Sequence, residues 1–280
     1  MLPSSLQVSI VTFQPDRALL DRTLHRLALA IAAAREAEVI RTVNVALIDN
    51  SEDRTSAGAV INLGRVRFAD SGVQKSYLHG HANIGFGAAH NLVLHGSGAD
   101  YHLVLNPDVE LDRDALAIGV RWLDAHPEIG ALAPYVTNAD GKTEYLCKRY
   151  PAVFDLMLRG FTPTFGRAFF RRRMERYEMR DVISAPPGNE VIDIPAMSGA
   201  VLLVRRKAID SSGGFDPKFF LYFEDFDWTV RLNRITRTAY VPSVKALHHG
   251  GGAARKGFKH VRWFTQSGWR FYRKHGWRWF

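Results

Sequence analysis

The chain has 280 residues, of which 46% are hydrophobic, 23% charged and 11% aromatic. This balance excludes disordered and fibrous proteins, and it supplies enough apolar side chains for a large core in one domain with an appendage or in two domains. The net charge of the chain is +9. Residues 255–280 contribute +8 and residues 159–180 contribute +5, so the rest of the chain carries a net charge of −4.

The first half alternates strand-like and helix-like segments. Residues 8–13, 43–48 and 102–105 are short apolar runs typical of buried strands, and Asp16 can cap a helix after the first of them. Residues 83–91 form a glycine-containing turn that opens another helix. The alternation predicts an α/β protein with a mostly parallel sheet.

The second half is less regular. After an amphipathic helix capped by Asp112, residues 159–180 fit either a basic helix or a mobile loop. The remaining expected features are strands at 131–136, 192–204 and 239–241 and a turn at 138–141.

The single cysteine, Cys147, permits neither an intrachain disulfide nor a cysteine-built metal site, which favours a reducing cytoplasm. The amino terminus lacks the basic and apolar regions of an export signal. The longest apolar run, residues 27–34, is too short to span a bilayer. We therefore expect a cytoplasmic protein without a transmembrane segment.

Polar residues fall where the predicted strands end. Asp49 and Asp108 follow the second and third strands, at the rim where open α/β sheets bind ligands. One carboxylate there can accept a nucleobase N–H and another can bind a cation on a diphosphate, although each alone also fits a turn. Gly85 and Gly87 suit close approach to a phosphate and equally suit a tight turn; His90 stands where a dinucleotide motif has its third glycine.

Residues 219–228 place three carboxylates among aromatic neighbours, and burial is expected to raise the pKa of at least one of them. On a helix that starts near Glu224, Asp227 and Arg231 form an ordinary i, i+4 pair. Asp225 has no obvious local partner. A carboxylate in that setting is suited to act as a general base facing a sugar.

His248 and His249 precede a run of glycines, which indicates close backbone approach to another group. A histidine pair is commonly a surface or core feature. Together with Asp108, however, one imidazole would form a cation site with open positions for phosphate oxygens.

The C-terminal segment fits an amphipathic helix. One side carries Val261, Phe264, Gly268, Phe271, Tyr272 and His275, and the other carries Lys259, Arg262, Arg270 and Arg273. Aromatic and basic side chains without acidic ones suit an anionic membrane surface. Single-stranded nucleic acid and simple packing on the domain are the competing interpretations.

Seven motifs, taken in order, resemble those of family 2 glycosyltransferases and, within them, the bacterial rhamnosyltransferase-like group. They are VSIVTF (8–13), IDNS (48–51), NIGFGAAHN (83–91), LNPDV (105–109), MSGA (197–200), GFD through YFEDFD (214–227) and HHGG (248–251). The resemblance implies a GT-A fold over residues 1–254, Rossmann-like with helices on both faces of the sheet. We assign residues 255–280 to a basic amphipathic helical extension.

The resemblance implies contacts with the nucleotide sugar at six positions. Thr12 and Asp49 match the nucleotide-contacting positions, and Asn83, Gly85 and Gly87 match the stretch beside the ribose and diphosphate. Asn106 replaces the first Asp of the D-x-D metal motif, giving the N-P-D form that rhamnosyltransferase-like members share; we place it with the nucleotide-sugar contacts.

The resemblance also implies the reacting and metal-binding residues. Asp108 matches the second carboxylate of D-x-D. His248 matches the late histidine that completes the Mg²⁺ or Mn²⁺ site, with His249 as the runner-up. Asp225 matches the catalytic base, and Glu224 lies beside it.

From these matches we expect an inverting enzyme that moves L-rhamnose from dTDP-L-rhamnose to a lipid-linked or lipopolysaccharide saccharide. Its C-terminal segment is expected to bind the inner face of the bacterial inner membrane, and no nucleic-acid partner is expected. The alternatives are a UDP-Gal, UDP-Glc or GDP-Man donor, or a non-catalytic membrane- or nucleic-acid-binding module. Retention of Asp49, Asp108, Glu224 and Asp225 favours the enzyme.

Overall fold

The computed structural model describes residues 3–161, 170–183, 188–250 and 258–279. Its strands are β1 (Ser4–Thr12), β2 (Ile40–Asp49), β3 (Gln74–Leu78), β4 (Tyr101–Leu105), β5 (Val109–Leu111), β6 (Ile129–Asn138), β7 (Thr143–Glu144), β8 (Cys147–Lys148), β9 (Val191–Ile192), β10 (Ala196–Met197), β11 (Val201–Arg205) and β12 (Arg237–His248). Its helices are α1 (Arg17–Glu36), α2 (Arg54–Arg67), α3 (Phe86–Leu94), α4 (Ala115–Ala125), α5 (Val153–Phe161), α7 (Arg171–Tyr177), α8 (Arg206–Ser212), α9 (Glu224–Leu232) and α10 (Phe258–His275).

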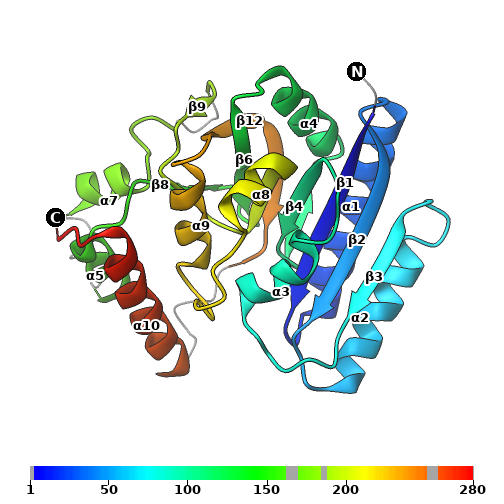
Figure 1. Ribbon diagram of the computed structural model, residues 1–280, viewed down its shortest axis with the longest axis horizontal. Coiled ribbons are helices and arrows are strands. Elements are labelled where there is room, and N and C mark those ends of the chain that lie inside the picture. The colour runs from blue at the N-terminus through cyan, green and yellow to red at the C-terminus, as the bar shows by residue number, and fades with distance from the viewer. Residues whose placement is uncertain (1–2, 162–169, 184–187, 251–257, 280) are drawn as a thin grey trace.

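A mixed sheet organises the described residues, with the strand order β3-β2-β1-β4-β11-β6-β12-β5 (Figure 1). β1 pairs in parallel with β2 on one side and β4 on the other, while β11 and β5 run antiparallel to their neighbours. The register sets Thr12 beside Asp49 and Ile10 beside Leu105. The carboxyl ends of three strands therefore meet at one edge, as the sequence predicts.

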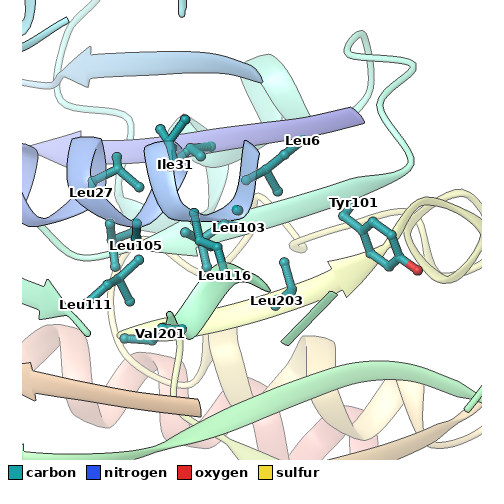
Figure 2. Packing of buried hydrophobic residues seen from close by; sticks show 14 of the residues in the cluster. Leu6, Leu27, Ile31, Tyr101, Leu103, Leu105, Leu111, Leu116, Val201 and Leu203 are labelled. Carbon is teal, nitrogen blue, oxygen red and sulfur yellow. The ribbon is translucent and has the colours of Figure 1, made fainter. Parts of the chain in front are cut away.

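Each face of the sheet carries its own core because successive side chains of a strand point to opposite faces. Leu103 and Leu203 belong to the core formed with α1 and α4. Val104 and Leu202 belong to the core on the other face, formed with α8 and α9. Helices thus cover both faces, as predicted, and Figure 2 shows the first core with Leu27 and Ile31 of α1 and Leu116 of α4.

Three predicted boundaries were wrong. The N-cap of α4 is Asp114 rather than Asp112, because the Asp112 carbonyl closes a short turn with the Ala115 N–H and the Asp114 carbonyl accepts the Ile118 N–H, the first bond of the helix. Residues 192–204 do not form one strand; they are divided among β9, β10 and β11 around the interrupting proline and glycine. The strand expected at 239–241 extends to the first histidine, with a shift of register across the intervening proline.

The basic segment at 159–180 contains a helix, α7, in its described part. Residues 162–169 of this segment lie outside the described residues, so the choice between helix and loop is not tested there. The predicted turn at 138–141 is present, because the Asn138 carbonyl accepts the Gly141 N–H and the chain returns as β7.

α10 lies beside α9 at the end of the molecule far from α2 (Figure 1). On the side of this helix that the sequence predicts to be apolar, Gly268, Phe271 and Tyr272 are buried in the structure. Val261, expected on the same side, is 46% exposed. The first turn instead contacts the body through His260 and Trp263, which lie further round the helix.

No helix in the described ranges has the combination of length and apolar character needed to cross a membrane.

A buried carboxylate joins α10 to α9. Asp227 is 0% exposed, and its Oδ2 accepts from Arg231 Nε at 2.9 Å, the i, i+4 pair that the sequence predicts. Its Oδ1 lies 2.8 Å from Lys274 Nζ and 2.7 Å from His275 Nε2. Burial would raise the pKa of Asp227, but hydrogen bonds from His275 and Lys274 outweigh burial and lower the pKa.

We predict that Asp227→Asn lowers the free energy of unfolding by about 3–5 kcal/mol, because it leaves the largely buried guanidinium of Arg231 without its carboxylate. Asp193→Asn is the matched control: its pair with Arg237 is exposed on both sides, and its loss should be below about 1 kcal/mol. Urea unfolding at pH 7 measures both changes. Equal losses would contradict the anchoring role of Asp227.

The pH dependence of stability in wild type and Asp227→Asn gives a second test. Because the pKa of Asp227 is lower in the folded than in the unfolded chain, its stabilisation is complete above the unfolded value of 3.8. The stabilisation is lost as the pH falls through the folded value. The difference between wild type and Asp227→Asn should therefore shrink in acid.

Candidate active site

The Asp49 carboxylate lies buried where β1 and β2 end. Its Oδ1 accepts from Thr12 Oγ1 at 2.9 Å, from Ser51 Oγ at 2.8 Å and from the Ser51 N–H at 3.2 Å. Its Oδ2 is buried and accepts no hydrogen bond. A buried acceptor without a donor is costly, so this oxygen is suited to a ligand N–H.

The glycine turn closes beside this carboxylate. Asn50 Nδ2 donates to the Gly85 carbonyl at 3.1 Å, and the Asn83 side chain accepts the Gly85 N–H at 3.1 Å. Gly85 has a φ of 90°, and a Cβ there would lie 2.3 Å from the Phe220 carbonyl oxygen. A Cβ on Gly87 would lie 2.8 Å from the Phe215 side chain. Packing alone thus explains why both positions are small.

The start of α3 is already hydrogen bonded to the opposite segment. The Phe86 N–H donates to the Phe220 carbonyl at 3.1 Å, so this N–H is not available to a phosphate in this conformation. His90, at the position of the absent third glycine, is fully buried and bonds Ser9 Oγ through Nδ1 at 2.6 Å. Burial lowers the pKa of His90 to about 3, so it is a neutral core residue.

Asp225 has the partner that sequence reasoning did not find. Its Oδ2 accepts the Gly199 N–H at 3.0 Å and its Oδ1 accepts the Phe226 N–H at 2.8 Å. A Cβ on Gly199 would come within 3.3 Å of the Asp225 Cβ and within 3.2 Å of the Phe86 ring. Two backbone N–H groups therefore fix the orientation of this half-buried carboxylate.

Glu224 is buried beside Asp225, with Oε2 lacking a hydrogen bond. Burial first, and the negative charge of Asp225 second, hold the pKa of Glu224 well above its usual range. The two residues before it, Tyr222 and Phe223, have φ values of 70° and 64° although neither is glycine. Such strain is concentrated at functional sites in proteins.

Asp108 and His248 meet at the other part of the rim. His248 Nε2 lies 3.4 Å from Asp108 Oδ1, a buried oxygen that accepts no hydrogen bond. His249 turns the other way and bonds Glu110 through Nε2 at 2.7 Å. The structure therefore brings the side chain of the first histidine to the Asp108 carboxylate, whereas His249 donates its backbone N–H to the Asp108 carbonyl at 2.9 Å.

Neighbouring charges shift the pKa values of Asp108 and His248 in opposite directions. Burial would raise the pKa of Asp108, but the contact with His248 lowers it below the usual range. Burial would lower the pKa of His248, but its pairing with the Asp108 and Glu144 carboxylates raises the pKa to about 9.

The chemistry of this pair fits a divalent cation, because an unsatisfied carboxylate oxygen and an imidazole nitrogen face each other. Among the described residues, no three or more His, Cys, Asp or Glu side chains are grouped to hold a metal ion. The protein would therefore supply two ligands and leave the remaining positions to phosphate oxygens and water.

A chain of contacts joins the parts of the rim. Asn50 bonds Gly85, the adjoining Phe86 ring contacts the Gly199 position, and Gly199 bonds Asp225. On the other side, the Asn106 N–H donates to the Ala200 carbonyl at 2.9 Å, two residues before Asp108. The predicted site residues thus lie around one edge of the sheet.

Three further residues lie at this edge that the sequence analysis did not identify as site residues. Phe13 is 54% exposed beside Thr12, Ser51 completes the Asp49 network, and Glu144 bonds His248. Ser51 lies within the quoted IDNS motif and could have been found from it. Glu144 lies 104 residues from its histidine and has no local signal.

Comparisons with known proteins identify the family of the chain. No family model matches the chain. The N-acetylglucosaminyl-diphospho-decaprenol L-rhamnosyltransferase of Mycobacterium tuberculosis H37Rv is 31% identical over 264 residues, which cover 87% of this chain and 76% of that protein. The rhamnosyltransferase WbbL of Escherichia coli K12 is 26% identical over 175 residues, 61% of each chain.

Solved structures share the fold at low identity. GalNAc-T7 with UDP, GalNAc and Mn²⁺ superposes with a TM-score of 0.63 at 13% identity, over 97% of this chain and 48% of that one, so the present chain spans about half of it. The mannosyltransferase PcManGT of Pyrobaculum calidifontis, with GDP-Man and Mn²⁺, gives 0.60 at 16% identity, over 97% and 64%. The predicted GT-A fold is thereby confirmed.

We predict that Glu224→Gln raises the free energy of unfolding at pH 7. Because the folded pKa exceeds the unfolded value of 4.5, the unfolded chain releases this proton first, and wild-type stability falls as the pH rises from 4.5 to the folded value. Gln cannot ionise, so the variant escapes this fall. Urea unfolding from pH 4.5 to 8 measures it, with the exposed Glu36→Gln as control; parallel pH curves for wild type and Glu224→Gln would refute the buried, neutral carboxyl.

Proposed function

Since the chain belongs to the rhamnosyltransferases of glycosyltransferase family 2, we propose that it transfers L-rhamnose from dTDP-L-rhamnose to a hydroxyl of a lipid-linked or lipopolysaccharide saccharide. The similarity to a named L-rhamnosyltransferase over most of both chains carries this choice of sugar and acceptor. The competing donors are UDP-Gal, UDP-Glc and GDP-Man.

Asp49 is proposed to bind the nucleobase. Its buried Oδ2 is free to accept the imide N–H of thymine, while Thr12 and Ser51 hold Oδ1 in place. The exposed ring of Phe13 beside it offers a stacking surface for the base. Asn83, Gly85, Gly87 and Asn106 are proposed to line the path of the ribose and diphosphate.

Asp108 and His248 are proposed to hold Mg²⁺ or Mn²⁺. When bound, this ion would offset the negative charge that develops on the departing diphosphate. The residues themselves supply one carboxylate oxygen and one imidazole nitrogen, and Asn106 adds no charge. The orphaned Asp108 Oδ1 supports this assignment.

Asp225 is proposed as the catalytic base. The acceptor oxygen attacks the anomeric carbon from the face opposite the diphosphate, its proton passes to Asp225, and the bond from the anomeric carbon to the diphosphate oxygen breaks. The Gly199 N–H orients the carboxylate for this transfer. Beside it, burial and the negative charge of Asp225 raise the pKa of Glu224.

The C-terminal helix is proposed to bind the anionic cytoplasmic leaflet. Trp269 is 53% exposed, with the Arg273 guanidinium 5.2 Å from its ring, and Trp277 and Trp279 stack at 5.3 Å with 45% and 59% exposure. Indole rings and arginines together suit the membrane interface. In this proposal residues 1–254 catalyse transfer and residues 255–280 hold the enzyme near a lipid-linked acceptor.

We predict that Asp225→Asn lowers the rate of rhamnose transfer by about 10²- to 10⁴-fold, the contribution expected of a general base. Binding of dTDP-L-rhamnose, measured by calorimetry with Mn²⁺ present, should stay within about threefold of wild type, since the nucleotide contacts are untouched. Asp53→Asn, at the exposed N-cap of α2, is the control and should transfer at the wild-type rate.

An active Asp225→Asn enzyme would remove Asp225 from the role of base. Tighter binding and faster transfer with UDP-Gal, UDP-Glc or GDP-Man than with dTDP-L-rhamnose would overturn the choice of donor.

We also predict that the wild-type protein sediments with vesicles rich in phosphatidylglycerol at low salt and is released as salt screens the charges. The double variant Trp269→Glu, Arg273→Glu should stay in the supernatant. Arg65→Glu with Val66→Glu makes the same kind of change on the exposed face of α2 and should sediment like wild type. A wild-type protein that never sediments, or equal release of both variants, contradicts the proposal.

A further inference from the structure

The His248 side chain is held from two sides. Its Nε2 lies 3.4 Å from Asp108, and its Nδ1 lies 2.7 Å from Oε2 of Glu144. The side chains of His248 and Glu144 are only 15% and 25% exposed, so water screens this contact little. Glu144 has no role in the reaction proposed above.

The partner on Nδ1 decides which nitrogen can bind a cation. An ionised carboxylate only accepts hydrogen bonds, so the proton between the two groups resides on Nδ1. A divalent cation would take the place of the other ring proton, the one on Nε2, which is the nitrogen that faces Asp108. A second hydrogen bond of this kind fixes the ring orientation and the tautomer of metal-binding histidines in general.

The fold delivers Glu144 to this place through a tight hairpin. The Asn138 side chain accepts the N–H groups of Asp140 and Lys142, and Gly141 has a φ of 74° that a turn requires. The hairpin pairs β7 with the end of β6, while β12 pairs with the other side of β6 and with β5. Glu144 and Asp108 thus approach His248 from opposite sides.

The neighbouring histidine supplies the contrast. The His249 side chain bonds Glu110 on β5, and Glu110 also lies 3.5 Å from Arg22 on α1. Each of the two adjacent histidines is therefore bonded to its own carboxylate: His248 to Glu144 and His249 to Glu110.

We propose that Glu144 is a positioning residue of the cation site, which holds the His248 ring so that Nε2 and the orphaned Oδ1 of Asp108 bind one divalent cation together. This inference rests on the proposed function, because it deepens the cation site assigned there. In this role Glu144 acts only by accepting the Nδ1 hydrogen bond and does not itself bind the cation.

The test measures Mn²⁺ binding rather than turnover. Free Mn²⁺ is followed by its electron paramagnetic resonance signal while the full-length protein with saturating dTDP is titrated. Glu144→Ala should weaken Mn²⁺ binding by about 10- to 100-fold, the usual effect of removing such a hydrogen-bond partner from a metal-binding histidine. Glu144→Gln keeps an acceptor for Nδ1 and should recover most of the affinity.

Glu110→Ala is the matched control, since it removes the same kind of partner from the adjacent histidine, and it should leave Mn²⁺ affinity unchanged. Binding of dTDP without metal, through Asp49, reports that each variant is folded. The inference fails if Glu144→Ala binds Mn²⁺ like wild type, if Gln restores nothing, or if Glu110→Ala loses as much. A wild-type protein that binds no Mn²⁺ with dTDP overturns the cation site and this inference together, whereas retained rhamnose transfer would leave the proposed activity standing.

Discussion

The parallel pairing of β1 with both β2 and β4 is the constraint on which the rest of the molecule depends. Because three strands run in one direction, Asp49 and the Asn106 turn reach the same edge, and Thr12 lies directly beside Asp49. α1 then holds the turn, since Thr23 Oγ1 donates to the Pro107 carbonyl at 2.9 Å. A change in any of these pairings would separate the proposed nucleotide contacts from the proposed cation site.

A second constraint acts on the segment that carries the proposed base. The strained residues Tyr222 and Phe223 are held by α10, because Ser267 Oγ donates to the Leu221 carbonyl at 2.9 Å and Tyr222 bonds His260. The buried Asp227 fastens the far end of the same helix. The helix that carries the exposed Trp269 is therefore also the one that supports the strained turn before α9.

Sequence patterns predicted the parts of this arrangement that depend on local physics. Apolar runs gave the central strands, and Asp16 caps α1 by accepting from the Ala18 and Leu19 N–H groups. The pattern could not give Glu144, since a two-residue strand leaves no periodicity. Nor could it choose between the two histidines, because the register shift in β12 disturbs the alternation that would say which side chain faces inward. The contact between the Gly199 N–H and Asp225 could not be predicted either, because it joins residues 26 apart in the sequence that only the fold brings together.

The most direct test of the account is a crystal structure of the protein with dTDP and Mn²⁺. The account predicts the thymine imide N–H on Asp49 Oδ2, the cation between Asp108 and His248 on the diphosphate oxygens, and the Asp225 carboxylate facing the space beyond the β-phosphate. A nucleotide bound at another surface, or a cation held without Asp108 and His248, would contradict it.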